Sequence, residues 1–319
     1  MPKPIGDIML RGRILAAALV AGSLLSACTH SVASDGEIES YRDRFGGLAS
    51  ADTSASVARG RYVLSRLRIT STTGLVATGR LLRPDTGHCL PAVLLQNGRE
   101  ENSAVIGRLP AEFGNVVVIA LDYPDEMPMA IQLRDVVTRQ RELQRAASEI
   151  PSLFLMGAAY LAERADVDSS RIALAATSFA VPFATIAAAA DERFKNVALI
   201  YGAGDLSRVL AANLSIKPEF LRGPGAWLAM QPFSAFGPER FIARIAPRPV
   251  IMVNGIDDPQ MPVEAVNALF ESARAPKAQV WMRTGHLLPT DSALIRTLVD
   301  TALTRMPVLD DSLSSGSCQ

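Results

Sequence analysis

The chain has few of the residues that build metal centres and disulfide-rich folds. Its 319 residues include three cysteines and three histidines, and the histidines (His30, His88 and His286) are scattered, so no cluster has the ligand spacing of a metal site. Acidic and basic residues balance at 32 each, and no basic run is interleaved with aromatic residues. These absences argue against a metal or other cofactor and against a nucleic-acid partner.

Hydrophobic residues make up 49% of the sequence, enough for one large core. Apolar runs of strand length recur with helical segments between them, which predicts a mostly parallel sheet with helices on both faces. We expect an opening hairpin over 61–70 and 74–83, and strands at 91–96, 115–121, 172–176, 196–200, 249–253 and 278–282. A helical crossover over 130–163 is expected to be interrupted at Pro151.

The strand at 172–176 runs through Ser178 into an alanine-rich helical segment over 179–190. A serine hydroxyl needs a base to become a nucleophile, and it must stand clear of the sheet to reach a carbonyl group. A sharp strand-to-helix turn meets the second need, and it aims backbone N–H groups at a developing oxyanion. Ser178 is therefore the candidate nucleophile.

A base and an acid follow in the chain. His286 comes after the last predicted strand, and an acidic loop with Asp257 and Asp258 follows the strand at 249–253. Asp205, after the strand at 196–200, is a weaker alternative acid. The order serine, acid, histidine resembles the triad of the α/β-hydrolase family, and Asp258 lies three residues after Gly255, as in the acid loop of dienelactone-hydrolase-like esterases.

This resemblance covers residues 60–306 and implies an eight-stranded, mostly parallel α/β-hydrolase sheet with a small apolar cap. It also implies backbone oxyanion donors at Phe179 and at Arg99 or Glu100, the latter in a loop that begins Asn97-Gly98. The sequence departs from the family's Gly-x-Ser-x-Gly pattern, because Ala176 and Ala180 replace both glycines. Each added methyl group needs a small shift at a strained turn.

An irregular, aromatic-rich segment over 201–247 occupies the position where the fold commonly carries its cap. An apolar cap over Ser178 provides a substrate pocket and excludes water. Trp227, Met230 and Phe233 are the candidate pocket residues, and the alternative is that they only cover the edge of the sheet.

The first 27 residues have the pattern of an export signal, with three basic residues before an apolar stretch over 14–25. The following Leu25-Ser26-Ala27-Cys28 resembles a bacterial lipobox, which implies lipidation of Cys28 and, with Thr29 next, the periplasmic face of the outer membrane. Residues 28–59 are predicted to be a flexible tether that contains a short helix around 37–45, and 307–319 a mobile tail. Export also leaves open a disulfide between Cys89 and Cys318.

Together these features predict a lipid-anchored hydrolase that cleaves a small carboxylic ester. A peptidase or thioesterase of the same fold shares the apparatus. The double-alanine turn leaves one further alternative, a non-catalytic envelope lipoprotein on a degenerate hydrolase scaffold.

We expect Cys28→Ser to abolish lipid attachment and release the protein from membranes, because the thiol is the acylation site of a lipobox. Fatty-acid labelling and detergent partitioning measure the loss, and activity of the released protein is expected to remain. Unchanged labelling and partitioning would contradict the lipobox assignment.

Overall fold

The computed structural model describes residues 31–98, 102–109, 114–128, 133–215 and 217–286, with four further residues between 297 and 306. Residues 32–319 form one unit. Cys28, Arg99, Glu100, Cys318 and the predicted tail lie outside the described residues. Cys89 is disulfide-bonded, and its pairing with Cys318 remains open.

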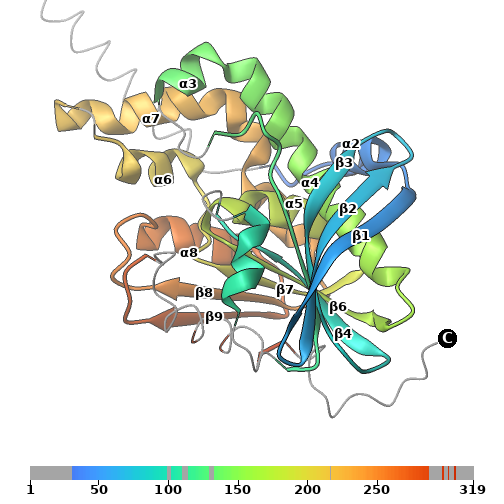
Figure 1. Cartoon of the computed structure of the whole chain (residues 1–319). Helices are drawn as coiled ribbons and strands as arrows, with labels where there is room; N and C mark the ends of the chain where they lie inside the picture. The colour runs from blue at the N-terminus through green and yellow to red at the C-terminus, as the bar shows by residue number, and fades with distance from the viewer. Residues whose placement is uncertain are drawn as a thin grey trace, which may run out of the picture. The chain divides into compact units, whose positions relative to one another are not determined.

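Nine strands form a single mixed sheet in the order β1-β2-β3-β5-β4-β6-β7-β8-β9 (Figure 1). The pairings β1–β2, β2–β3 and β3–β5 are antiparallel. The pairings β5–β4, β4–β6, β6–β7, β7–β8 and β8–β9 are parallel. The strands are β1 (Leu48–Arg59), β2 (Tyr62–Ser71), β3 (Val76–Pro84), β4 (Leu90–Gln96), β5 (Val117–Leu121), β6 (Val167–Thr177), β7 (Phe194–Ile200), β8 (Val250–Gly255) and β9 (Lys277–Met282). The mostly parallel sheet is confirmed, with one strand more than the eight expected.

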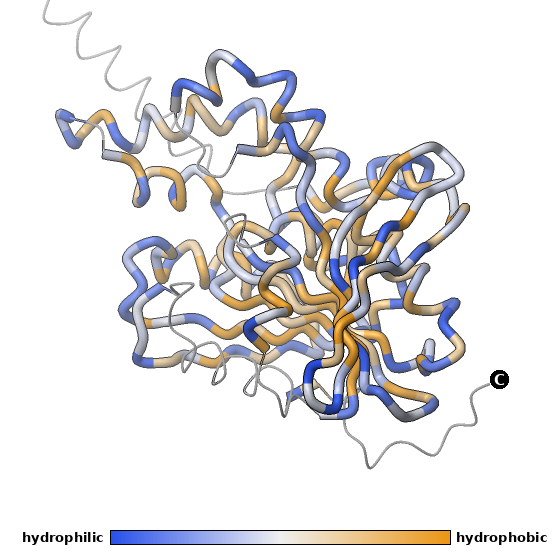
Figure 2. The backbone as a smooth tube through the Cα atoms, viewed as in Figure 1, coloured by the Kyte–Doolittle hydropathy of each residue, from blue (hydrophilic) through white to orange (hydrophobic). Residues whose placement is uncertain are grey.

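The central parallel strands are buried along their length. Every residue of β4, β5 and β8 is buried, which matches their mainly apolar sequences. Figure 2 shows hydrophobic residues concentrated on these strands, with hydrophilic residues on the outer turns. The carboxyl ends of β4, β6, β7, β8 and β9 therefore meet at one edge of a rigid core.

Helices connect the parallel strands, and α4 and α5 pack against the sheet and against each other. The described helices are α2 (Asp35–Phe45), α3 (Leu133–Thr138), α4 (Gln140–Ala162), α5 (Val181–Ala190), α6 (Leu206–Asn213), α7 (Arg222–Met230) and α8 (Val263–Ser272). Short 3-10 turns are η1 (Asn102–Arg108), η2 (Ser178–Ala180), η3 (Glu219–Leu221), η4 (Gln231–Phe236), η5 (Pro238–Arg240) and η6 (Ile242–Arg244). None of the described helices is long and apolar enough to cross a membrane.

The predicted interruption at Pro151 is wrong, because α4 runs through this residue, and the break lies instead at Arg139, between α3 and α4. A proline inside a helix removes one hydrogen bond and costs about 3 kcal/mol. Burial offsets this cost: every side chain from 150 to 161 is buried, and Ser152 Oγ donates a hydrogen bond to the Tyr41 carbonyl of α2 (3.0 Å).

The predicted tether over 28–59 is also wrong from Ala33 onward, because α2 and β1 belong to the fold. Ser34 and Glu37 form a capping box at the start of α2, and Ile38, Tyr41 and Phe45 are buried. Arg240 pairs with Glu37 (2.6 Å), and its carbonyl accepts a hydrogen bond from Ala33 N–H (2.8 Å). Backbone pairing with β2 holds the polar strand β1 at the sheet edge. Because this pairing does not require apolar side chains, the composition of β1 gave no hydrophobic signal.

Ile38→Ala is expected to lower the free energy of unfolding by roughly 2–5 kcal/mol, because it empties a buried site under α2. Asp43→Ala, on the exposed side of the same helix, is the matched control and should change it by less than about 0.5 kcal/mol. Urea denaturation measures both, and equal stability of the two variants would restore the tether interpretation.

Candidate active site

Ser178 lies at the tight turn between β6 and α5. Its backbone φ is 51°, in the left-handed region that a residue with a side chain adopts at a cost of about 1–3 kcal/mol. The preceding Thr177 is still extended, and α5 begins three residues after the serine, at Val181. The turn therefore lifts the hydroxyl off the carboxyl end of the sheet and places it before a helix N-terminus.

The turn forms with alanine at both family glycine positions. Ala176 and Ala180 are both fully buried, so each methyl group has a place in the core. Ala176 lies opposite Gln96 on β4 and Leu199 on β7. The departure from the family pattern does not prevent the strained serine conformation.

The structure brings Ser178, His286 and Asp258 into one hydrogen-bonded line. Ser178 Oγ lies 3.3 Å from His286 Nε2, and His286 Nδ1 lies 2.7 Å from Asp258 Oδ2. A carboxylate only accepts hydrogen bonds, so in the neutral imidazole Nδ1 carries the proton and Nε2 accepts from the serine hydroxyl. This tautomer is the one in which a histidine can take a proton from serine.

Backbone hydrogen bonds fix the carboxylate of Asp258. Its carboxylate is inaccessible to solvent, and its second oxygen accepts hydrogen bonds from the backbone N–H groups of Gln260 (2.8 Å) and Met261 (3.3 Å). With Oδ1 and Oδ2 both engaged, the carboxylate has a single orientation toward the imidazole.

Neither alternative acid is bound to the histidine. Asp257 is exposed. Asp205 caps α6 and accepts hydrogen bonds from Ser207 Oγ (2.6 Å) and Arg208 Nε (3.2 Å). Burial raises the pKa of Asp205, but these hydrogen bonds outweigh it and leave the pKa below its usual value. Asp205 therefore caps α6 and pairs with Arg208.

Two residues that sequence reasoning missed hold the histidine loop. The Tyr201 ring packs against the His286 ring, with centroids 5.1 Å apart, and its hydroxyl lies 3.0 Å from Thr284 Oγ1. Tyr201 directly follows β7 and has a φ of 52°. Its position at the carboxyl end of a parallel strand was the available signal.

Gly255 allows the acid and histidine loops to approach each other. A Cβ at this position would lie 2.3 Å from the Thr284 carbonyl oxygen, a distance that no side chain tolerates. The glycine of the predicted acid loop thus has a steric role: it lets β8 and the segment after β9 come close enough for Asp258 to reach His286.

The start of the predicted oxyanion loop is fixed by three side chains. Gln96 Nε2 donates to the Leu121 carbonyl (2.9 Å), and Gln96 Oε1 accepts from the Leu121 N–H (3.2 Å), as the backbone of a neighbouring strand would. Thr177 Oγ1 donates to Asn97 Oδ1, and Tyr123 donates to the Asn97 carbonyl (2.6 Å). Arg99 and Glu100 lie outside the described residues, so their proposed N–H donors remain predictions.

An apolar cavity of about 370 Å³ opens beside Ser178. Helices α6 and α7 and turn η4, all within the predicted cap segment 201–247, contribute to its lining. Met230 and Phe233 line it as predicted, together with Phe179, Phe183, Phe236, Leu143, Leu206 and Leu210. Trp227 does not: it is 56% exposed, because α7 buries only Ala226 and turns the neighbouring tryptophan to solvent.

No protein-family profile and no curated protein sequence matches the chain. Solved structures do. Acetyl xylan esterase 1 from Thermoanaerobacterium sp. JW/SL YS485 is 15% identical with a TM-score of 0.62, covering 85% of this chain and 94% of its own. An acetyl xylan esterase from Paenibacillus sp. R4 is 17% identical with a TM-score of 0.63, covering 86% and 97%.

A cold-adapted esterase from an Arctic intertidal metagenomic library is 13% identical with a TM-score of 0.50, covering 79% of this chain and 99% of its own. At such low identity these likenesses speak to the fold alone. Together with the strand order they show that the chain has an α/β-hydrolase-like fold.

Proposed function

We propose that this protein is a serine hydrolase that cleaves a carboxylic ester through an acyl-enzyme intermediate. The observation that carries the proposal is the hydrogen-bonded line from Ser178 through His286 to the buried Asp258. The fold neighbours named as esterases support the same reaction type. A complete line of nucleophile, base and orienting acid counts against a purely binding role.

In the proposed mechanism each side chain of the line has a defined role. Ser178 Oγ attacks the ester carbonyl while His286 Nε2 takes its proton, and the same nitrogen then protonates the departing alcohol. Asp258 keeps the imidazole in the tautomer that accepts at Nε2 and stabilises its charged form. Water, activated by His286, then attacks the acyl group and frees the carboxylic acid and Ser178.

The negative charge on the carbonyl oxygen needs donors at the turn. The backbone N–H of Phe179, at the start of the helical segment, is the first proposed donor, and the N–H of Arg99 or Glu100 is the second. The Asn97 contacts to Thr177 and Tyr123 anchor the start of the loop that carries the second donor.

The cavity suits an apolar acyl or alcohol group. Its lining is dominated by aliphatic and aromatic side chains, with Ser178 at its edge. Apolar walls exclude water from the ester and strengthen the electrostatic interactions around it. We propose a small-molecule ester whose apolar part fills this space.

The anchor proposed at Cys28 places this hydrolase at the bacterial cell envelope. Ala33 is already packed against Arg240, so the linker between lipid and folded domain is about five residues, at most roughly 18 Å when extended. The domain would therefore remain close to the membrane surface rather than range on a long tether.

Ser178→Ala and His286→Ala should each lower kcat by about 10³-fold or more, and the double variant should lose little beyond that, because the two groups act as one unit. Asp258→Asn should also be severe, because it disturbs the tautomer, whereas Asp257→Asn, an exposed neighbour, is the matched control. Hydrolysis of a chromogenic short-chain ester gives the rates.

A fluorophosphonate probe tests the nucleophile independently of the substrate. Parent protein should be labelled and Ser178→Ala should not. Absence of labelling in folded parent protein would reject the hydrolase proposal, and damage at Asp257 or Asp205 that exceeds damage at Asp258 would reassign the acid.

Phe233→Ala should lower kcat/KM for an apolar ester by roughly tenfold, because it removes about 1.5 kcal/mol or more of apolar contact from the cavity wall. Trp227→Ala, in the same cap segment but facing solvent, should stay near the parent value. Both variants are assayed with esters of increasing acyl chain length. A larger loss of kcat/KM at Trp227→Ala than at Phe233→Ala would place the substrate outside this cavity.

A further inference from the structure

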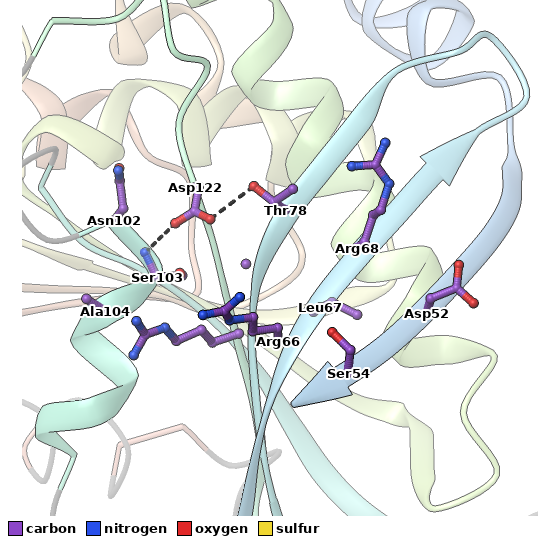
Figure 3. A pocket seen from close by; sticks show the side chains of 12 residues that line it. Asp52, Ser54, Arg66, Leu67, Arg68, Thr78, Asn102, Ser103, Ala104 and Asp122 are labelled. Carbon is purple, nitrogen blue, oxygen red and sulfur yellow. Dashed lines mark hydrogen bonds between the residues drawn. The ribbon is translucent and has the colours of Figure 1, made fainter. Parts of the chain in front are cut away.

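A second, polar hollow of about 610 Å³ lies away from the Ser178 cavity and shares no lining residue with it. We call it the arginine groove. It runs along β1, β2 and β3 and is closed on one side by the start of η1 and by Asp122 after β5 (Figure 3). Its lining residues are Asp52, Ser54, Arg66, Leu67, Arg68, Thr78, Gly79, Arg80, Asn102, Ser103, Ala104 and Asp122.

Strand register gathers three arginines there. Arg66 on β2 lies directly opposite Arg80 on β3, and Arg68 is two residues further along β2. Like charges directly opposite each other destabilise a sheet. Within the described part of the chain, none of the three guanidinium groups has a hydrogen-bond or ion-pair partner, and Arg66 and Arg68 are exposed. Asp52 on β1 lies opposite Arg68, so Arg66 and Arg80 carry the positive charge that has no acidic residue paired with it across the strands.

The opposite wall of the arginine groove is held in place by hydrogen bonds. One carboxylate oxygen of Asp122 accepts a hydrogen bond from the backbone N–H of Ser103 (3.1 Å), and the other accepts one from Thr78 Oγ1 (3.0 Å), as Figure 3 shows. Asn102 Oδ1 accepts the backbone N–H of Tyr123 (3.4 Å). A Cβ on Gly107 would lie 3.9 Å from Arg80 Nη1, so this side chain reaches η1 across the groove.

We propose that the arginine groove binds an acidic carbohydrate. Guanidinium groups recognise the planar or tetrahedral oxyanion of a carboxylate or phosphate. The hydroxyls of Ser54 and Thr78, the Asn102 amide and the two aspartates supply the donors and acceptors that sugar hydroxyls use. The ligand therefore carries one or more acid groups among several hydroxyls.

The charge balance separates this ligand from other anions. Three arginines against two aspartates leave a formal surplus of one positive charge in the lining, too little for a dense polyanion such as nucleic acid. Among the residues that the structure describes, no aromatic side chain lines the groove, so these residues offer no platform on which bases stack. A bare inorganic anion would satisfy the arginines but leave the aspartates facing it.

Two adjacent residues after β5 connect the arginine groove with the surroundings of Ser178. Asp122 belongs to the groove, and the next residue, Tyr123, packs edge-on against Phe179 (5.5 Å) and holds Asn97. A sugar bound in the groove would therefore sit next to the residues that anchor the oxyanion loop. The binding itself does not depend on the proposed hydrolysis.

Isothermal titration calorimetry on the full chain carrying Ser178→Ala, in mild detergent and low salt, tests the proposal without turnover. The probes are tetragalacturonate, glucose 6-phosphate, neutral maltotetraose, inorganic phosphate and a short single-stranded DNA. We expect an acidic sugar to bind at least about tenfold more tightly than maltotetraose and phosphate, and binding to weaken with added salt. The tighter of the two acidic sugars identifies the acid group.

Arg66→Gln and Arg80→Gln should each weaken that binding by about tenfold or more, as loss of a charged pairing predicts. Arg83→Gln, on the same strand as Arg80 but outside the groove, is the matched control and should stay within about twofold. Thermal melts should show no loss of folding at Arg66→Gln, because removing one of two opposed like charges relieves repulsion.

Several results would overturn the proposal. These are no binding of either acidic sugar, equal binding of maltotetraose or inorganic phosphate, tighter binding of DNA, or equal losses in the Arg83→Gln control. Each is separable from the fluorophosphonate test at Ser178, because groove binding is measured on a protein that lacks the nucleophile.

Discussion

The positive backbone angle at Ser178 is the constraint on which the rest of the site depends. A serine held at a φ of 51° costs about 1–3 kcal/mol, and such a conformation persists only where the surroundings leave no alternative. β6 is paired on both sides, with β4 up to Ala176 and with β7 up to Thr177. α5, which follows, is buried over nearly all its residues. Neither the strand nor the helix can shift to relax the turn.

The position of the hydroxyl then decides where the acid and the base must lie. Parallel strands deliver their following loops to one edge, so the segments after β8 and β9 already point toward Ser178. The loops after β8 and β9 can approach each other because Gly255 has no side chain. Two backbone donors orient Asp258, and the Tyr201 ring packs against His286. The geometry of the proposed triad is largely a property of the sheet, refined by a few contacts between loops.

The contrast between positions set by the sheet and contacts made between loops explains what the sequence could and could not predict. Ser178 and Asp258 follow strongly apolar strands and His286 follows the last strand, so their order in the chain was enough to predict that they meet. Tyr201 has the same kind of position, but an aromatic residue after a strand has many structural uses. β1 was missed, and the expected short helix around 37–45 was assigned to the tether, because backbone pairing, a capping box and three buried side chains hold these elements, not hydrophobic composition. Trp227 was misplaced because its exposure depends on how the short α7 lies on its neighbours.

Alternation at the end of β5 links the two polar features of the molecule. Successive side chains of an extended chain point to opposite sides, so Asp122 faces the arginines of β2 and β3 while Tyr123 faces Phe179. The Gln96 amide fixes the backbone of Leu121 immediately before them. A displacement of this short segment would therefore move both the wall of the arginine groove and the hydroxyl that holds Asn97. Asp122 and Tyr123 are adjacent, so a single peptide unit separates the wall of the arginine groove from the hydroxyl that holds Asn97 at the start of the predicted oxyanion loop.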